Sequence, residues 1–200
     1  MKPGIKICGI RRIEDVNACN TYHPDYVGFM FWKESTRYVS PEQATILHMG
    51  LDVRIRRVGV FLDHSISDVA KIASSGIIDI VQLHGSEDDA YIRSLRRKIS
   101  LPVIKAFSVK KGATPDQING SSADLVLIDS GRGGTGEVFD WDFLRKIKRD
   151  YLLAGGLTPE NAGEAAATGA FALDVSSGVE TDGYKDADKI ARFIANVRGQ

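Results

Sequence analysis

The sequence predicts an α/β fold of the (β/α)8 barrel class, formed by a single domain over residues 1–200. Short apolar runs rich in Val, Ile and aromatic residues alternate with amphipathic segments along the whole chain, as parallel strands do with crossover helices. The repeat of roughly 20–30 residues suits a barrel, although 200 residues is short for one. Residues of unusual chemistry follow most of the strands, and in a barrel the carboxyl ends of all strands form one functional face.

The expected elements follow from these apolar runs and from helix-start signals. The strands are expected at residues 5–8, 26–31, 57–62, 78–83, 103–109, 125–128, 151–154 and 171–175. Helices are expected to begin near Arg12, Pro41, Ser65, Glu87, Pro115, Trp141, Pro159 and Asp186. Pro41 follows a serine and Pro159 follows a threonine, which is a capping residue and then proline in the first helical turn. A doubly wound open sheet would use only a few strand ends, near its switch point.

Composition excludes several classes of partner. Lys plus Arg and Asp plus Glu each number 26, so no overall field attracts nucleic acid or an acidic membrane. No apolar run reaches the ~20 residues of a membrane span, and the first residues do not resemble a signal peptide. Cys8 and Cys19 form no metal-type pair, and His23, His48 and His64 occur singly. We therefore expect a cytoplasmic enzyme, a monomer or homodimer, without metal or cofactor.

Two glycine-bearing turns suggest a phosphate site. Gly155 and Gly156 end one strand, and Ser176, Ser177 and Gly178 follow the last one. Glycine lets several backbone N–H groups approach one anion, and barrels often bind phosphate after strands seven and eight. The alternative is a pair of tight turns without a ligand. The sequence favours a small phosphorylated substrate.

Cys8 and Asp129 are the candidate catalytic residues. Cys8 ends the first strand before a glycine, although a buried cysteine is more often a small core residue, as we expect for Cys19. Asp129 follows an apolar strand, where desolvation raises a carboxyl pKa and makes it a usable proton donor; the alternative is a turn cap. The glycine-rich segment 131–136 lacks the Gly-Lys-Ser/Thr ending of a P-loop.

Other polar residues near strand ends are candidate substrate contacts. Arg37 lies in the loop after the second strand, and its planar guanidinium suits a carboxylate. Gln82 and His84 flank the end of the fourth strand, and we expect Lys105 and Asp174 at the ends of the fifth and eighth strands. For each, a solvated or internally satisfied side chain is the alternative.

Taken together, the segments resemble the phosphoribosylanthranilate isomerases of tryptophan biosynthesis. The matching segments are KICG (6–9), GFMF (28–31), STRYV (35–39), VF (60–61), QLHG (82–85), DS (129–130), GGTG (133–136), FDW (139–141), LAGGL (153–157) and LDVSSGVE (173–180). They cover nearly the whole chain in the order of the family. Each motif alone is modest evidence, whereas the ordered set is strong.

The resemblance implies a barrel that catalyses an Amadori rearrangement of N-(5-phosphoribosyl)anthranilate. It implies that Asp129 is the general acid that opens the ribose ring and that Cys8 is the general base that removes the C2′ proton. Arg37 would hold the anthranilate carboxylate, and the two glycine turns would hold the phosphate. These roles require the barrel to raise the pKa of Asp129 and to lower that of Cys8.

The chain departs from the family pattern at a few positions, and other functions compete. Lys33 and Thr36 stand where prolines are usual, Arg11 stands where threonine is expected, and Glu137 stands where a basic or polar residue is expected. A pentose-phosphate epimerase would need metal-binding histidines at strand ends, and an indoleglycerol-phosphate synthase would need a lysine–glutamate pair. A non-catalytic phosphosugar-binding protein would keep the glycine turns without needing both Cys8 and Asp129. The sequence also leaves open whether the protein acts on a second aminoaldose phosphate.

Overall fold

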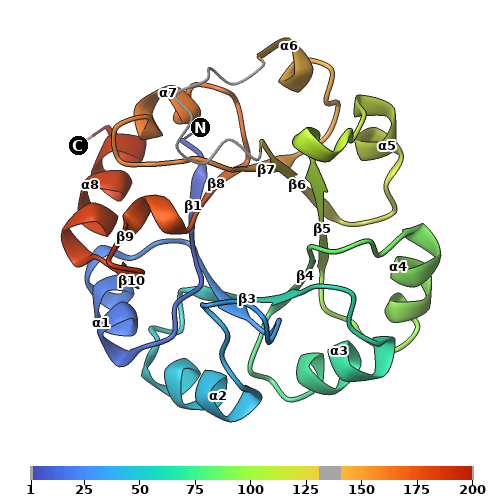
Figure 1. The fold of residues 1–200 in the computed structure, drawn as a ribbon, viewed down its shortest axis with the longest axis horizontal. Coiled ribbons are helices and arrows are strands. Elements are labelled where there is room, and N and C mark those ends of the chain that lie inside the picture. The colour runs from blue at the N-terminus through green and yellow to red at the C-terminus, as the bar shows by residue number, and fades with distance from the viewer. Residues whose placement is uncertain (1, 131–140, 200) are drawn as a thin grey trace.

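Eight parallel strands close into a barrel in the computed structural model of the chain, which describes residues 2–130 and 141–199 (Figure 1). The strands are β1 (Gly4–Cys8), β2 (Tyr26–Met30), β3 (Arg56–Phe61), β4 (Ile80–Leu83), β5 (Val103–Ser108), β6 (Leu125–Asp129), β7 (Tyr151–Ala154) and β8 (Ala172–Val175). Each pairs in parallel with the next, and β8 pairs with β1. The (β/α)8 barrel expected from the sequence is confirmed, with strand bounds shifted by at most two residues.

The side chains of the strands divide between two apolar clusters. One fills the barrel interior and contains Cys8, Val58, Val60, Ile80, Ile104, Ala106, Leu127, Leu152, Ala154 and Ala172. The other lies between the strands and the helices and includes Ile5, Ile7, Val126 and Ile128. Because successive side chains of a strand point to opposite faces, residues two apart on a strand share a side. This alternation places Cys8 and Asp129 on the interior face.

Helices surround the barrel as an outer ring (Figure 1). They are α1 (Ile13–Tyr22), α2 (Pro41–Gly50), α3 (Ile66–Ala73), α4 (Asp89–Arg96), α5 (Pro115–Gly120), α6 (Trp141–Leu144), α7 (Ala162–Ala166) and α8 (Ala187–Arg198). Ser40 and Thr114 each accept a hydrogen bond from the third residue of the helix that follows, before a proline at the first position. These caps satisfy backbone donors that a helix leaves unpaired. None of the helices within the described ranges is long and apolar enough to cross a membrane.

Three features differ from the expected elements. Helix α7 begins at Ala162 rather than near Pro159, because the Asn161 side chain accepts from the N–H of Thr158 and donates to the carbonyl of Gly156, which holds a turn there. After β8 the chain forms a short 3-10 helix, η2 (Ser177–Val179), and a hairpin of β9 (Glu180–Thr181) and β10 (Tyr184–Lys185). A second 3-10 helix, η1 (Val109–Lys111), follows β5.

Some segments singled out in the sequence lie outside the described residues. They are the glycine-rich segment 131–136, which includes the family-like residues 133–136, then Glu137, and the family-like residues 139–140.

Candidate active site

Cys8 ends strand β1 at the mouth of the barrel and is buried. Gly28 on β2 makes room for it, since a Cβ atom there would lie 2.7 Å from the Cys8 sulfur. Gly9 follows with φ of +80°, and the side chain of Arg37 lies against it, where a Cβ atom would be 2.6 Å from Cδ of Arg37. The Ser176 hydroxyl donates to the carbonyl of Cys8 at 3.0 Å and joins the ends of β1 and β8. The thiol is therefore closely enclosed by backbone.

Lys6 and Asp174 form a buried ion pair beside Cys8. The two residues are register partners on β1 and β8, and Nζ of Lys6 donates to Oδ2 of Asp174 at 2.9 Å. The Lys6 side chain has no exposed surface. Burial lowers the pKa of Lys6, but the charges of Asp174 and Cys8 raise it more strongly, so it lies above its ordinary value. Lys6 therefore stays an ammonium ion inside the barrel.

Burial raises the pKa of the Cys8 thiol above its ordinary value. The positive charges of Lys6 and Lys185 lower this pKa and the carboxylate of Asp174 raises it, but desolvation is the largest effect. The expectation that the barrel lowers the Cys8 pKa is wrong for the protein without substrate. Burial destabilises the thiolate by more than these cations stabilise it. Any thiolate must therefore be stabilised further when a ligand binds.

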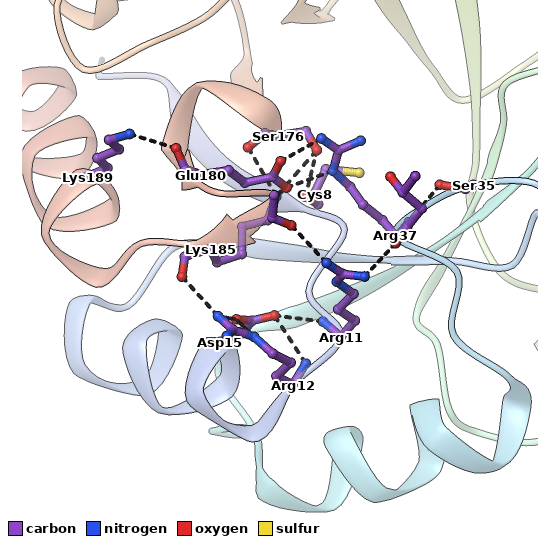
Figure 2. Close-up of polar contacts among 12 residues, drawn as sticks. Cys8, Arg11, Arg12, Asp15, Ser35, Arg37, Ser176, Glu180, Lys185 and Lys189 are labelled. Carbon is purple, nitrogen blue, oxygen red and sulfur yellow. Dashed lines mark hydrogen bonds and ion pairs between the residues drawn. The ribbon is translucent and has the colours of Figure 1, made fainter.

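A chain of charges occupies the same side of the mouth (Figure 2). Arg37 donates from Nε and Nη2 to the two carboxylate oxygens of Glu180, at 2.7 and 2.6 Å. Lys185 on β10 donates to the same carboxylate at 2.6 Å and to the carbonyl of Ser176 at 3.1 Å. Burial raises the Glu180 pKa, but these two cations lower it more, so the carboxylate stays ionised. The two hydrogen bonds to Glu180 thus hold Arg37 in place, and they do not use its Nη1 group.

Arg11 ties the loop that carries Arg37 to the hairpin that carries Glu180 (Figure 2). Its guanidinium donates to the carbonyls of Thr36 at 2.6 Å and Gly183 at 2.8 Å. It also lies 4.6 Å from the centre of the Tyr184 ring. Two of the positions at which the chain departs from the family pattern, Arg11 and Thr36, therefore contact one another.

Asp129 and His84 define a second side of the mouth, at the ends of β6 and β4. Nε2 of His84 lies 3.7 Å from Oδ2 of Asp129. Both residues line a cavity of about 660 Å³ that extends from the mouth outward to α4 and α5. A cavity of this size is ample for a drug-sized ligand. Asp129 therefore faces a space that is large enough for a substrate.

Gln82 and Lys105 lie near Asp129 and His84, but their side chains point to opposite faces of the barrel sheet. Gln82 is completely buried; its amide contacts Nδ1 of His84 at 2.9 Å, and its Oε1 has no hydrogen-bond partner among the described residues. Lys105 lies within β5 rather than at its end as expected, and because it alternates with the interior residues Ile104 and Ala106 it points toward the helix layer. There its ammonium donates to the carbonyl of Gly85 at 2.6 Å and to Glu87 at 2.9 Å. Lys105 lines the cavity with its hydrogen bonds already made.

Strand register connects the two sides. Asp129 pairs with Ala154 on β7, Ala154 pairs with Asp174 on β8, and Asp174 pairs with Lys6 on β1. Paired residues in a parallel sheet direct their side chains to the same face. Asp129, Asp174 and Lys6 therefore share the barrel interior, with Cys8 one interior position nearer the mouth.

The two glycine turns meet beside this row. Gly155 and Gly156 adopt φ of +92° and +68°, in the left-handed region that favours glycine. A Cβ atom at Gly178 would lie 1.8 Å from the carbonyl oxygen of Leu157, so the turn after β8 packs directly on the turn after β7. The Ser130 hydroxyl donates to the carbonyl of Gly155 at 2.9 Å and fixes the first turn. The turns expected to bind phosphate are thus brought together.

The second cysteine lies away from the mouth, and the described residues hold no metal-type cluster. Cys19 is fully buried in the outer core, and burial raises its pKa to about 12, as suits the core residue expected from the sequence. Within residues 2–130 and 141–199, no group of three or more His, Cys, Asp or Glu side chains is arranged to hold a metal ion.

Sequence reasoning missed several charged residues of the site. Lys6 precedes Cys8 by two positions in an apolar strand, and that spacing was a usable signal because it places both on one face. Glu180 belongs to the family-like segment 173–180, but its partner Arg37 is 143 residues away in the chain. Lys185 lies on a two-residue strand that gives no recognisable apolar run. Its place in the site depends on the tertiary fold.

The fold and the site define a class of protein, the barrel enzymes that gather acid–base residues at the carboxyl ends of their strands. A family model for N-(5′-phosphoribosyl)anthranilate (PRA) isomerase matches residues 5–196. The N-(5′-phosphoribosyl)anthranilate isomerase of Clostridium kluyveri (strain ATCC 8527) is 43% identical over 197 residues, covering 97% of each chain. The chain belongs to the N-(5′-phosphoribosyl)anthranilate isomerase family.

Solved structures agree with this assignment. The phosphoribosyl anthranilate isomerase of Thermus thermophilus is 33% identical with a TM-score of 0.87, and the match covers 98% of both chains. Another structure shows such an isomerase in complex with reduced 1-(o-carboxyphenylamino)-1-deoxyribulose 5-phosphate; it is 34% identical with a TM-score of 0.82, over 99% of this chain and 100% of the other. The family and the isomerase class expected from the sequence are confirmed.

Proposed function

We propose that the whole chain acts as one barrel domain that converts N-(5-phosphoribosyl)anthranilate to 1-(2-carboxyphenylamino)-1-deoxyribulose 5-phosphate, with Asp129 as general acid and Cys8 as general base. Family membership supports the reaction. The observation that carries the residue roles is the row of register partners that sets Asp129, Asp174 and Lys6 on one interior face with Cys8. A sugar in the mouth would meet a carboxyl on one side and a thiol on the other.

The proposed steps balance without a metal or an oxidant. Asp129 gives its proton to the ribose ring oxygen, the bond from C1′ to that oxygen breaks, and the anthranilate nitrogen forms an iminium with C1′. The iminium acidifies the C2′ proton, which the Cys8 thiolate removes to give an enolamine. Protonation at C1′ and loss of the hydroxyl proton at C2′ complete the ketone. The iminium also brings a positive charge next to Cys8, which opposes the raised thiol pKa of the free protein.

Arg37 is the proposed partner of the anthranilate carboxylate. It lies against Gly9, next to Cys8, and Glu180 fixes its direction through two hydrogen bonds. A guanidinium fork can bind a carboxylate through its remaining donors. The carboxylate would therefore bind on the thiol side of the mouth.

The phosphate site is proposed at Gly155, Gly156, Ser176, Ser177 and Gly178. Left-handed glycines in the first turn and its close packing on Gly178 support this position. Backbone N–H groups converging from two turns bind an anion without any lysine or arginine. This agrees with a chain of zero formal net charge.

Gln82, His84, Lys105 and Asp174 are proposed as further substrate contacts. Oε1 of Gln82 and Oδ1 of Asp174 are buried acceptors without a partner among the described residues, and sugar hydroxyls are suitable donors. His84 lies at the cavity beside Asp129. Lys105 would add its charge at the cavity wall, since Gly85 and Glu87 accept its hydrogen bonds.

The test supplies purified protein with freshly made phosphoribosylanthranilate and follows the loss of its fluorescence, with and without a chelator. We expect turnover that the chelator leaves unchanged. A parallel assay tests whether the protein also acts on a second substrate. It uses an aminoaldose phosphate whose nitrogen carries a group other than benzoate. The proposal fails if phosphoribosylanthranilate disappears only at its spontaneous rate of decomposition.

The expected assembly and location stay predictions. A monomer and a homodimer are the two assemblies that we propose, and light scattering coupled to size-exclusion chromatography distinguishes them by mass. The cytoplasmic location is tested by fractionating cells that produce the protein.

A further inference from the structure

Lys6 is a buried ammonium group that neither the proposed substrate contacts nor the proposed acid–base pair uses. It has no exposed surface and lies in the barrel interior, where an apolar side chain would fill the same space. Taking an ammonium ion and a carboxylate out of water costs several kcal/mol per ion before their mutual attraction offsets it. A buried pair of this kind therefore adds little net stability, and its position next to a catalytic thiol suggests a functional use.

The geometry places Lys6 and Cys8 on the same face of one strand. They are two positions apart on β1, and their side chains alternate with those of Ile5 and Ile7, which belong to the outer core. The positive charge of the Lys6 ammonium lowers the pKa of the Cys8 thiol. The hydrogen-bond partner of the ammonium is Oδ2 of Asp174 at 2.9 Å. Lys6 thus donates to a carboxylate on β8 and shares its face of β1 with the sulfur atom of Cys8.

We propose that Lys6 is a positioning residue that stabilises the thiolate of Cys8, and that Asp174 holds Lys6 in place while limiting how much of its charge acts on the sulfur. The catalytic meaning of this role rests on the proposed function of Cys8 as the base. When Cys8 releases its proton to solvent, the negative charge on sulfur faces the Lys6 ammonium at once. When the thiolate takes the C2′ proton, Lys6 keeps its own protons and remains paired with Asp174.

The other charges around the thiol act more weakly or are neutralised elsewhere. Lys185 and Arg37 both interact with Cys8, but they share one carboxylate on strand β9, to which each donates at 2.6 Å. Asp174 acts in the opposite sense and raises the pKa of the thiol. Three cations thus face Cys8 against two carboxylates among the described residues, and of the cations Lys6 has the largest effect on the thiol. Its removal leaves the thiolate beside the Asp174 carboxylate.

The test measures the pH midpoint for alkylation of Cys8 by iodoacetamide in the substrate-free protein, with mass spectrometry to separate the Cys8 and Cys19 peptides. Lys6→Met should raise the midpoint by about one pH unit or more, the usual effect of losing a close opposite charge. This shift slows alkylation about tenfold at a fixed pH below the midpoint. Asp174→Asn should lower the midpoint, because it removes the charge that opposes the thiolate. Lys148→Met removes an exposed lysine and should leave the midpoint unchanged.

Opposite shifts from the two variants separate a tuning role from a structural one. Loosened packing would expose the thiol in both variants and move both midpoints downward. Since Lys6→Met leaves Asp174 buried without its partner and can prevent folding, the double variant Lys6→Met/Asp174→Asn supplies a second measurement. Its midpoint should lie above that of Asp174→Asn alone. Equal midpoints in those two proteins, or an unchanged midpoint in folded Lys6→Met, would overturn the proposal.

Activity supplies an independent readout. In an enzyme whose acid must be protonated and whose base must be ionised, kcat/KM is flat between the two pKa values and falls above the higher one. Lys6→Met should move this alkaline fall to higher pH and lower the flat region by the same factor. If alkylation shifts as expected but phosphoribosylanthranilate is not converted, the proposed function fails and the link between Lys6 and Cys8 stands. If the substrate is converted but alkylation does not shift, the link between Lys6 and Cys8 fails and the proposed function stands.

Discussion

The thiol side and the carboxyl side of the barrel mouth differ in how their charges are held. On the thiol side, Lys6 pairs with Asp174 at 2.9 Å, and Glu180 binds two cations. On the carboxyl side, His84 and Asp129 are 3.7 Å apart, and their side chains are 31% and 28% exposed. Cys8, by comparison, is 7% exposed. The thiol is therefore the more enclosed of the two groups, and the carboxyl side opens into a large cavity.

The difference suits the two proposed roles. A base that is a weakly ionised thiol needs fixed charges to oppose the desolvation that raises its pKa, and such charges act most strongly where water is excluded. An acid must regain its proton after each turnover, and contact with water supplies it. The cavity beside Asp129 also leaves space for the sugar chain after the ring opens. Variants on each side should therefore fail in different ways.

Cys8→Ala tests the thiol side most severely. We expect turnover to fall by about two or more orders of magnitude, the usual scale for loss of an acid–base group. Cys19→Ala is the matched control, because Cys19 is also buried but belongs to the outer core. It should alter the stability of the protein and leave kcat near that of the wild type. Near-normal turnover in Cys8→Ala would remove the thiol from its role.

Asp129→Asn tests the open side. The amide keeps the size of the carboxyl but cannot donate a proton in its place, so turnover should again fall by about two or more orders of magnitude. Asp116→Asn makes the same chemical change at an exposed position on the wall of the same cavity and should leave turnover unchanged. Steady-state kinetics on both proteins makes the comparison. Equal activity of the two variants would contradict the assignment of Asp129.

Arg37 is expected to affect binding more than chemistry. Arg37→Ala should raise KM about tenfold or more, since hydrogen bonds to charged groups contribute about 1.5–3 kcal/mol. Arg37→Lys keeps the charge but loses the planar fork that now binds Glu180. Its KM should lie between those of the wild type and Arg37→Ala. Unchanged KM and kcat in the alanine variant would refute the carboxylate site.

Two glycines give the smallest and most local effects. Gly28→Ala forces a Cβ atom to within 2.7 Å of the Cys8 sulfur and 3.1 Å of its Cα. Such overpacking costs about 1–3 kcal/mol of unfolding free energy, and displacement of the thiol should lower kcat. Gly163→Ala on α7 meets no atom nearer than 4.0 Å and should stabilise the protein by about 0.5–1 kcal/mol. Urea denaturation of both variants measures these changes, and a stable, fully active Gly28→Ala would show that the thiol is less confined.

The barrel could be predicted from sequence because its signals are local. Each strand is an apolar run, and the caps at Ser40 and Thr114 depend on neighbouring residues only. The start of α7 was missed because the Asn161 side chain holds a turn that Thr158 and Pro159 did not indicate. The β9–β10 hairpin was missed because its strands have two residues each.

The positions of the candidate residues were predictable from the sequence but their electrostatics were not, and the roles proposed for these residues stay predictions. Cys8 and Asp129 follow from their places at strand ends, whereas the pairing of Arg37 with Glu180 depends on segments far apart in the chain. The direction of the Cys8 pKa depends on whether burial outweighs Lys6, and only the three-dimensional arrangement decides that. Lys105 shows the same limit, because strand alternation directs it to Glu87 in the helix layer.

The most direct test is a crystal structure of this protein with a reduced analogue of the product bound. We expect its phosphate to accept hydrogen bonds from backbone N–H groups of the turns at Gly155–Gly156 and Ser177–Gly178. The sulfur of Cys8 should face C2′, and the carboxyl of Asp129 should face the oxygen that closes the ribose ring. A phosphate bound away from these turns, or a sugar chain that reaches only one of the two side chains, would contradict the account.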